Sequence, residues 1–223
     1  MKKRIVVAVV IAVLLAVSAY AQTTNFFQLA QSGTAQDVQA AISKGADVNA
    51  PDKTDPRQKT PLMYAARFNP NPEVITVLLK AGAKIEAHDP GNGSTPLMHA
   101  AYNNPNPEVI TTLLKAGANI EARDFFGGTP LIVAAMGNKN SEVITVLLKA
   151  GADIEARDTD FGSTALIHAA QYNPNPEGIT ILLKAGANAK VRDNAGMTAL
   201  DHAKSNYSLK GTDALKQLEE ASK

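Results

Sequence analysis

The sequence predicts an all-α solenoid in which helix-turn-helix units stack side by side and hairpin-like loops protrude between them. A Thr-Pro-Leu or Thr-Ala-Leu triplet recurs every 34 or 35 residues, and a Gly-Ala pair follows each of the first four triplets by 22 residues. The remaining segment, from Gly-Ala to the next triplet, is 12 or 13 residues long. Length variation confined to one segment is typical of a surface loop. The triplets begin at Thr60, Thr95, Thr129, Thr164 and Thr198.

Each unit carries the start and stop signals of two short helices. Thr60 is a good N-cap, because its hydroxyl accepts an orphan backbone N–H, and Pro61 suits the first helical position. The second helix is predicted over residues 72–81, where apolar residues recur at helical spacing. Gly82 suits the left-handed position that follows a helix. Residues 89–94 are rich in turn formers, which predicts a hairpin-like loop.

The phrase Asn-Pro-Asn-Pro-Glu marks the turn between the two helices. It occurs in three units and becomes Asn-Lys-Asn-Ser-Glu in the remaining one. A residue before proline is pushed out of the helical region, so Asn69 is expected to end the first helix. Asn71 is then placed as the N-cap of the second helix and Pro72 as its first residue. The unit without prolines predicts that the same turn also forms without them.

These repeated residues resemble the ankyrin repeat family. The resemblance is carried by Thr-Pro-Leu-x-x-Ala-Ala and by Glu-Val-Ile-x-x-Leu-Leu-Lys-Ala-Gly-Ala-x-Ile-Glu-Ala, which return in register over residues 25–223. The resemblance implies a stack that binds protein partners along its concave face, through the loop tips and the first helices of the units.

The predicted organisation is a signal peptide over residues 1–21 and one ankyrin repeat domain over residues 22–223. Within the domain we expect an N-terminal cap at 25–50, four full repeats at about 57–191 and a C-terminal cap at about 195–222. A terminal repeat needs a polar outer face. In the first unit this face is predicted to consist of Gln28, Gln31, Gln36 and Gln39.

The N-terminus has the pattern of a secretory signal. Lys2, Lys3 and Arg4 precede an apolar run over residues 5–17, and Ala19-Tyr20-Ala21 places small residues where a signal peptidase cleaves. Thirteen apolar residues are fewer than the ~20 that span a bilayer, which favours a cleaved signal over a membrane anchor. We therefore expect cleavage after Ala21 and a periplasmic or secreted protein of bacterial origin.

Charge and composition narrow the choice of partner. Removal of the signal lowers the formal net charge from +1 to about −2, which disfavours nucleic acid and anionic membranes. The chain has no cysteine, which excludes disulfides, thiolate metal sites and a cysteine nucleophile. We expect a monomer whose mature chain does not insert into a membrane.

Three histidines, His99, His168 and His202, occupy the same position in their units. A row of this kind suggests a metal site or a proton relay, but adjacent repeats place such residues about 10 Å apart, and Val133 interrupts the row. Histidines packed at the edge of the groove are the favoured interpretation. No Ser-His-Asp order, HExxH motif or phosphate-binding loop is present. We predict no catalytic residue, no cofactor and no metal site.

Aromatic residues at the loop tips and at the ends of the first helices are the candidate partner-binding residues. Exposed aromatic side chains at protruding positions are typical anchors of protein interfaces. The alternative is that these rings fold back onto neighbouring repeats. The candidates are Phe125, Phe126 and Phe161 at the loop tips, which we place at the centre of the surface, with Phe68, Tyr102 and Tyr172 at the helix ends.

The sequence therefore predicts a non-catalytic protein–protein interaction module that is exported to the periplasm or out of the cell. Two alternatives stay open. One is an inhibitor or immunity-type protein that blocks an enzyme with the same surface, and the other is a secreted effector directed at a host cell. An enzyme is disfavoured, because the repeats fill the mature chain and leave no residues for an added domain.

Overall fold

The computed structural model describes residues 26–223, and the expected signal peptide over residues 1–21 lies outside them. Within the described residues there are helices, turns and loops but no strand, and no helix is both long and apolar enough to cross a bilayer. The first described helix covers residues 26–32. The helices that follow are α2 (Ala35–Ser43), α3 (Pro61–Phe68), α4 (Pro72–Lys80), α5 (Pro96–Asn103), α6 (Pro107–Lys115), α7 (Pro130–Gly137), α8 (Glu142–Lys149), α9 (Ala165–Tyr172), α10 (Glu177–Lys184), α11 (Ala199–Ser205), a 3₁₀ turn η1 (Tyr207–Leu209) and α12 (Asp213–Ala221).

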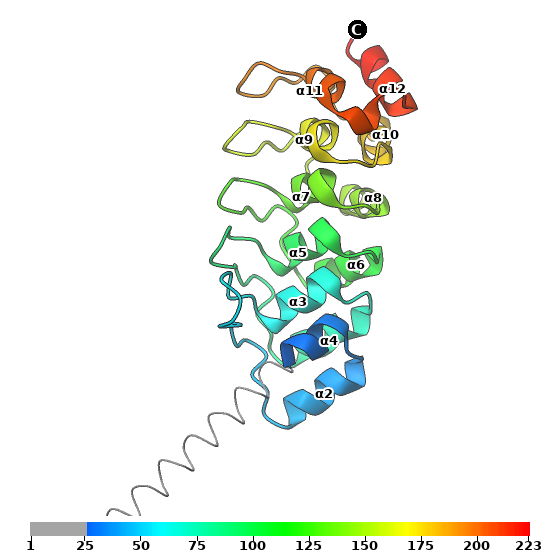
Figure 1. The fold of residues 1–223 in the computed structure, drawn as a ribbon. Coiled ribbons are helices and arrows are strands. Elements are labelled where there is room, and N and C mark those ends of the chain that lie inside the picture. Colours follow the sequence, from blue (N-terminus) through cyan, green and yellow to red (C-terminus); the bar gives the residue numbers. More distant parts are fainter. Residues whose placement is uncertain (1–25) are drawn as a thin grey trace, which may run out of the picture.

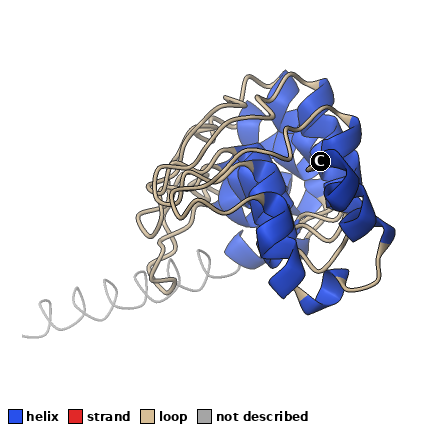
Figure 2. Ribbon diagram, turned by 90° about the horizontal axis from the view of Figure 1, so that it is seen from above, coloured by secondary structure: helices blue, strands red, loops and turns tan. Residues whose placement is uncertain are grey.

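The helices form two columns, with the hairpin loops projecting to one side (Figure 1). In one column α3, α5, α7, α9 and α11 pack each on the next, and in the other α2, α4, α6, α8, α10 and α12 do the same. Seen along the stack, the loops gather beside the helices (Figure 2). The predicted all-α solenoid of stacked helix-turn-helix units with protruding loops is confirmed.

The helix boundaries follow the predicted start and stop signals. Thr60 is the N-cap of α3, where its Oγ1 accepts a hydrogen bond from the Met63 backbone N–H at 3.4 Å. Asn71 caps α4 by accepting the N–H of Glu73 at 2.9 Å. Gly82, which follows α4, has a φ of 91°, and residues with a side chain rarely adopt that value.

The turn between the helices also forms in the unit without prolines. Asn140 accepts the N–H of Glu142 there at 3.0 Å, the same bond that Asn71 makes in its unit. The prolines therefore stiffen a turn whose hydrogen bonds come from asparagine.

The core is a continuous apolar layer between the two columns. In the unit of α3 and α4 it contains Leu62, Ala66, Val74, Ile75 and Leu78, all at most 1% exposed. The equivalent residues of the other units are buried in the same way. Burying one Leu or Ile side chain contributes about 1.5–3 kcal/mol. Because no cysteine is present, this packing between neighbouring units is the main support of the stack.

A row of buried asparagines ties each unit to the one before it. The side chain of Asn104 is fully buried. Its Nδ2 donates to the backbone oxygens of Ala66 at 2.8 Å and Asn69 at 2.9 Å, while its Oδ1 accepts the Asn106 N–H at 2.9 Å. Sequence analysis assigned Asn69 only the end of a helix, whereas its Nδ2 also reaches back to Ala30 and Gly33. We call this row the asparagine ladder: Asn69, Asn104, Asn138, Asn173 and Asn206.

The alternating length of the units arises in the hairpin loops. The loop over residues 89–94 has one residue more than the loop over 124–128, yet in both the first N–H donates to the last carbonyl at 3.1 Å. Adjacent tips are also linked, since the Thr159 N–H donates to the Phe126 carbonyl at 2.9 Å. A Cβ on Gly127 would lie 2.6 Å from the Thr159 nitrogen, so this close approach requires glycine.

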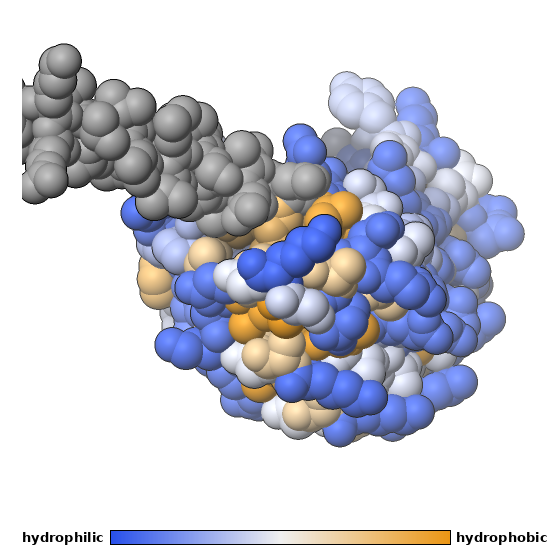
Figure 3. All heavy atoms as spheres, turned by 90° about the horizontal axis from the view of Figure 1, so that it is seen from below, coloured by the Kyte–Doolittle hydropathy of each residue, from blue (hydrophilic) through white to orange (hydrophobic). Residues whose placement is uncertain are grey.

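The N-terminal end of the stack is mainly hydrophilic, with hydrophobic patches between the polar side chains (Figure 3). Phe26 and Phe27 of the first unit are buried. The four glutamines predicted for the outer face of this unit are all exposed: Gln28, Gln31, Gln36 and Gln39. The first unit therefore turns an apolar face to the stack and a polar one to solvent.

Candidate partner-binding cleft

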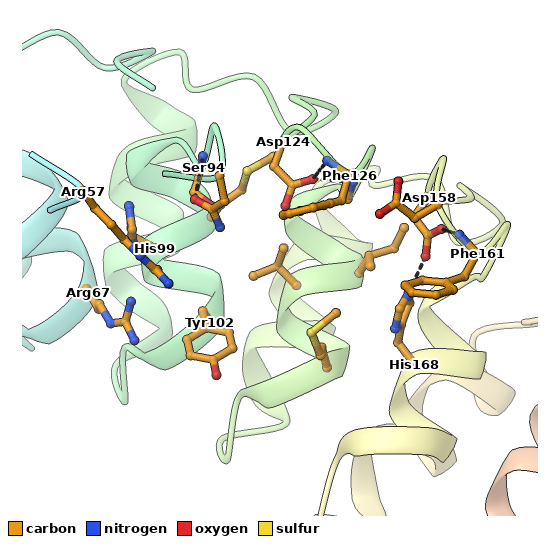
Figure 4. Close-up of a pocket in the computed structure, with 17 residues that line it drawn as sticks. Arg57, Arg67, Ser94, His99, Tyr102, Asp124, Phe126, Asp158, Phe161 and His168 are labelled. Atoms are coloured by element: carbon orange, nitrogen blue, oxygen red, sulfur yellow. Dashed lines mark hydrogen bonds and ion pairs between the residues drawn. The ribbon is translucent and has the colours of Figure 1, made fainter. Parts of the chain in front are cut away.

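A cleft of about 500 Å³ lies between the hairpin loops and the first helices of the units. Residues of the loops before α3, α5, α7 and α9 and residues of these helices line it. Figure 4 shows the two sets of side chains pointing toward one another across the opening. Its volume lies within the range of about 300–1,000 Å³ that is usual for ligand sites. We call this feature the loop–helix cleft.

Two positions of the repeat supply the side chains that vary along the cleft. The seventh residue after the triplet threonine is Arg67, Tyr102 or Met136 in α3, α5 and α7. The residue before the left-handed loop glycine is Asn92, Phe126 or Phe161. Positions such as the paired alanines of α3, α5, α7 and α9 keep the same residue in these four units. The cleft is therefore a varied surface on a constant scaffold.

Aspartate–histidine pairs join the hairpin loops to the first helices. The His99 Nε2 lies 2.9 Å from the Asp89 Oδ2, and the His168 Nε2 lies 2.5 Å from the Asp158 Oδ2. All four side chains are at most 4% exposed. We predicted that these histidines pack at the edge of the groove, and the structure buries them more deeply than that. Within residues 26–223 no group of three acidic or histidine residues is placed to hold a metal ion.

The unit of α7 and α8 has no such pair, because Val133 stands where the other units have histidine or tyrosine. Asp124 keeps the usual backbone contacts of a loop aspartate. Its Oδ1 accepts the N–H groups of Phe126 at 3.0 Å and Gly128 at 2.8 Å. Its Oδ2, the atom that meets histidine in the other loops, has no hydrogen-bond partner among the described residues.

The surroundings of Asp124 disfavour its negative charge. Burial raises the pKa of Asp124 above its ordinary value, and the charges of Asp158 and Asp160 add to this increase, while the two backbone hydrogen bonds oppose it. Asp124 is half-buried and Asp160 is exposed. Near α7 and α9, Asp124 and Asp160 have no ion-pair partner within the described residues.

Two arginines stand at the other end of the cleft. The guanidinium carbon of Arg67 lies 5.1 Å from the ring centre of Tyr102 and 5.3 Å from that of Phe68, within the range of cation–π contacts. Arg57 reaches the same end from the loop before α3 (Figure 4). Among residues 26–223 neither arginine forms an ion pair, and the Arg67 Nε is buried without a hydrogen-bond partner.

The cleft brings together three of the six aromatic residues that the sequence singled out. Tyr102, Phe126 and Phe161 line it and are 39%, 50% and 58% exposed. These rings do not fold back into the core. Their contact with a partner stays a prediction.

The other three aromatic candidates lie outside the lining. Phe125 is the most exposed of the six and sits beside Gly93 of the preceding loop, where any Cβ would meet its ring. Phe68 lies under the Arg67 guanidinium. The Tyr172 ring stacks on that of His168, with 5.9 Å between the ring centres.

Sequence reasoning missed Arg67, Asp124 and Met136 as residues of the cleft. The signal for Arg67 and Met136 was present, because they share a repeat position with Tyr102. The signal for Asp124 was the interruption of the histidine row by Val133, which sequence analysis treated only as an argument against a metal site. What that interruption does to the facing aspartate depends on a contact between a loop and a helix.

The free energy of unfolding is expected to fall on mild acidification, because His99 is buried. Burial lowers the pKa of His99 below its ordinary value of 6.5, although the Asp89 carboxylate opposes the change. A histidine whose pKa is lowered by folding binds its proton more readily when unfolded. Stability is therefore fully present above pH 6.5 and is lost as the pH falls through the folded pKa. Thermal unfolding followed by circular dichroism from about pH 8 to about pH 5 measures this loss.

The matched variant for this prediction is His99→Gln, which keeps an N–H donor for Asp89 but does not titrate. Its melting temperature is expected to change less with pH than that of the unmodified protein. An identical pH dependence in the two proteins would assign the loss to other groups.

The fold and the cleft define a class of protein: a helical repeat scaffold that presents a continuous binding surface, since each unit contacts only its neighbours. The family model described as "Ankyrin repeats (3 copies)" matches residues 26–124, 69–158 and 131–221. The chain therefore belongs to the ankyrin repeat family, whose members are generally protein–protein interaction modules. No curated protein sequence matches the chain.

Proposed function

We propose that this ankyrin repeat protein is an exported, non-catalytic module that binds a protein partner in the loop–helix cleft and along the hairpin tips. The observation that carries the proposal is the gathering of Tyr102, Phe126 and Phe161 around one cleft, each at least 39% exposed. Aromatic side chains bury a large area and dominate the energetics of many interfaces. Export is supported by the signal pattern over residues 1–21, and the mass of the exported chain tests cleavage after Ala21.

Replacing Phe125, Phe126 and Phe161 together with serine is expected to abolish capture of the partner. The three side chains are the most exposed rings of the hairpin tips, so their loss removes apolar contact area without opening a cavity in the core. The measurement is affinity capture from an envelope extract of the source cells, with captured proteins identified by mass spectrometry. Far-ultraviolet circular dichroism verifies that the helices remain.

The matched control is Tyr207→Ser. Tyr207 is 91% exposed but lies in the turn between α11 and α12, away from the cleft-lining residues. A protein captured by the unmodified chain and by Tyr207→Ser, but not by the triple variant, supports the proposal. If the triple variant captures the same proteins, the loop tips are not the binding surface.

A further inference from the structure

We propose that the loop–helix cleft takes an extended segment of the partner that seats a Lys or Arg side chain against Asp124 and a carboxylate against Arg67 and Arg57. This inference rests on the proposed function, which names the surface only. It adds the chemistry of the segment and the orientation in which the segment lies along the stack.

The cationic position follows from the missing partner of Asp124. In three other loops the aspartate Oδ2 contacts a histidine Nε2 at 2.9, 2.5 and 2.7 Å. Val133 removes that contact in the unit of α7 and α8, and the Asp124 Oδ2 has no protein hydrogen-bond partner among the described residues. A half-buried carboxylate with a free oxygen favours a positively charged donor, because a charge-assisted hydrogen bond stabilises its ionised form.

The neighbours of Asp124 suit an ammonium or guanidinium group. Phe126 and Phe161 line the cleft beside it, and Asp158 and Asp160 belong to the next loop (Figure 4). Aromatic faces attract cations, and the two further aspartates add negative potential. Because His168 already engages Asp158, Asp124 and Asp160 are the carboxylates left to meet a ligand.

The anionic position follows from Arg67 and Arg57. The Arg67 guanidinium lies against two aromatic rings, and neither arginine has an ion-pair partner within residues 26–223. A guanidinium fixed by stacking presents its N–H groups in a planar fork that matches a carboxylate. The acceptor is an Asp or Glu side chain of the segment, or the carboxylate at the end of a chain.

Apolar side chains also line the cleft: Tyr102 comes from the intervening unit, and Val133 and Met136 come from the same unit as Asp124. Arg67 and Asp124 are contributed by units two steps apart in the stack. Helices pack about 8–10 Å apart, so two steps span about 16–20 Å. An extended chain advances about 3.3 Å per residue, and the opposite charges of the segment are therefore about five to six residues apart, with apolar residues between them.

The test is selection of peptides from a phage-displayed library of random decapeptides on the purified full chain. The expected result is enrichment of peptides in which a Lys or Arg and an Asp, Glu or C-terminal carboxylate are separated by an apolar stretch. The order of the two charged groups and the number of residues between them are expected to be the same in all enriched peptides. Three variants are compared: Asp124→Asn, Arg67→Gln and Val133→His. Fluorescence anisotropy with a labelled selected peptide then gives the dissociation constants.

Val133→His is the sharpest of the variants, because it gives Asp124 the partner that His99 and His168 give their own aspartates. It leaves every charge of the wild-type cleft in place. Like Asp124→Asn, it is expected to weaken binding of the selected peptide about tenfold to a hundredfold. In both variants the selection is expected to lose its preference for Lys or Arg and to keep its preference for the acidic group. Arg67→Gln is expected to remove the preference for the acidic group and to leave the preference for Lys or Arg unchanged.

Three results would overturn the inference. One is a selection that returns apolar peptides without the charge pattern, or no peptide at all. The second is an unchanged cation preference in Val133→His, and the third is a wild-type dimer that becomes monomeric in the cleft variants, which would make a second copy of the chain the occupant. The proposed function fails separately, by unchanged capture in the triple phenylalanine variant.

Discussion

Replacing Asn104 with alanine is expected to lower the free energy of unfolding by about 2–4 kcal/mol, because a buried polar group without a partner costs about 1–3 kcal/mol. The variant leaves the carbonyls of Ala66 and Asn69 and the N–H of Asn106 without their side-chain partner. Asn104 lies between two internal repeats, so the variant weakens the packing of these repeats against each other. Urea unfolding followed by circular dichroism measures the effect.

Asn106→Ala is the matched control, since it changes the same residue type in the same turn. The Asn106 side chain caps α6 through the Glu108 N–H at 3.0 Å and is only partly buried. Loss of an N-cap costs about 1 kcal/mol. The Asn106 Nδ2 also donates an exposed hydrogen bond to the Pro70 carbonyl of the preceding unit at 2.7 Å, so equal losses in the two variants would show that burial of the asparagine ladder adds nothing to such bonds.

Replacing His99 with valine is expected to lower the free energy of unfolding by about 2–4 kcal/mol at neutral pH, because it strips a buried carboxylate of its hydrogen-bonded partner. Valine is the residue that the unit of α7 and α8 carries at this position. Asp124 tolerates it there because that aspartate is half-exposed, whereas the Asp89 side chain is fully buried. The measurement is again urea unfolding.

The double variant Asp89→Asn with His99→Val separates the charge from the cavity. The asparagine Oδ1 still accepts the N–H groups that Gly91 and Asn92 donate at 2.9 Å, while the buried negative charge is gone. The double variant is expected to be more stable than His99→Val alone. If it is less stable, the histidine acts mainly by filling space.

Much of the fold could be predicted, because its signals are local and recur. The threonine cap, the asparagine cap and the glycine after the second helix lie within a few residues of the turns they set, and the four full units repeat them. The predicted second helix over residues 72–81 compares with α4 at Pro72–Lys80. The protruding loops were predicted because only the segment between Gly-Ala and the next triplet varies in length.

The cleft could be predicted only in part, because its chemistry depends on contacts between loops and helices and between neighbouring units. Exposed rings at Phe126 and Phe161 follow from their places at loop tips. The free oxygen of Asp124 depends on Val133 in the following helix, and the cation–π contact of Arg67 depends on Tyr102 in the next unit. The residue types in the sequence do not by themselves predict which of these side chains meet.

The asparagine ladder also has a direction. Every ladder side chain donates to carbonyl groups of the unit that precedes it in the chain. A ribosome or an export channel releases the N-terminal unit first, so the acceptors of each asparagine are made before the asparagine itself. The stack can therefore grow in the order of translation, and no repeat has to wait for a later one before its buried amide is satisfied.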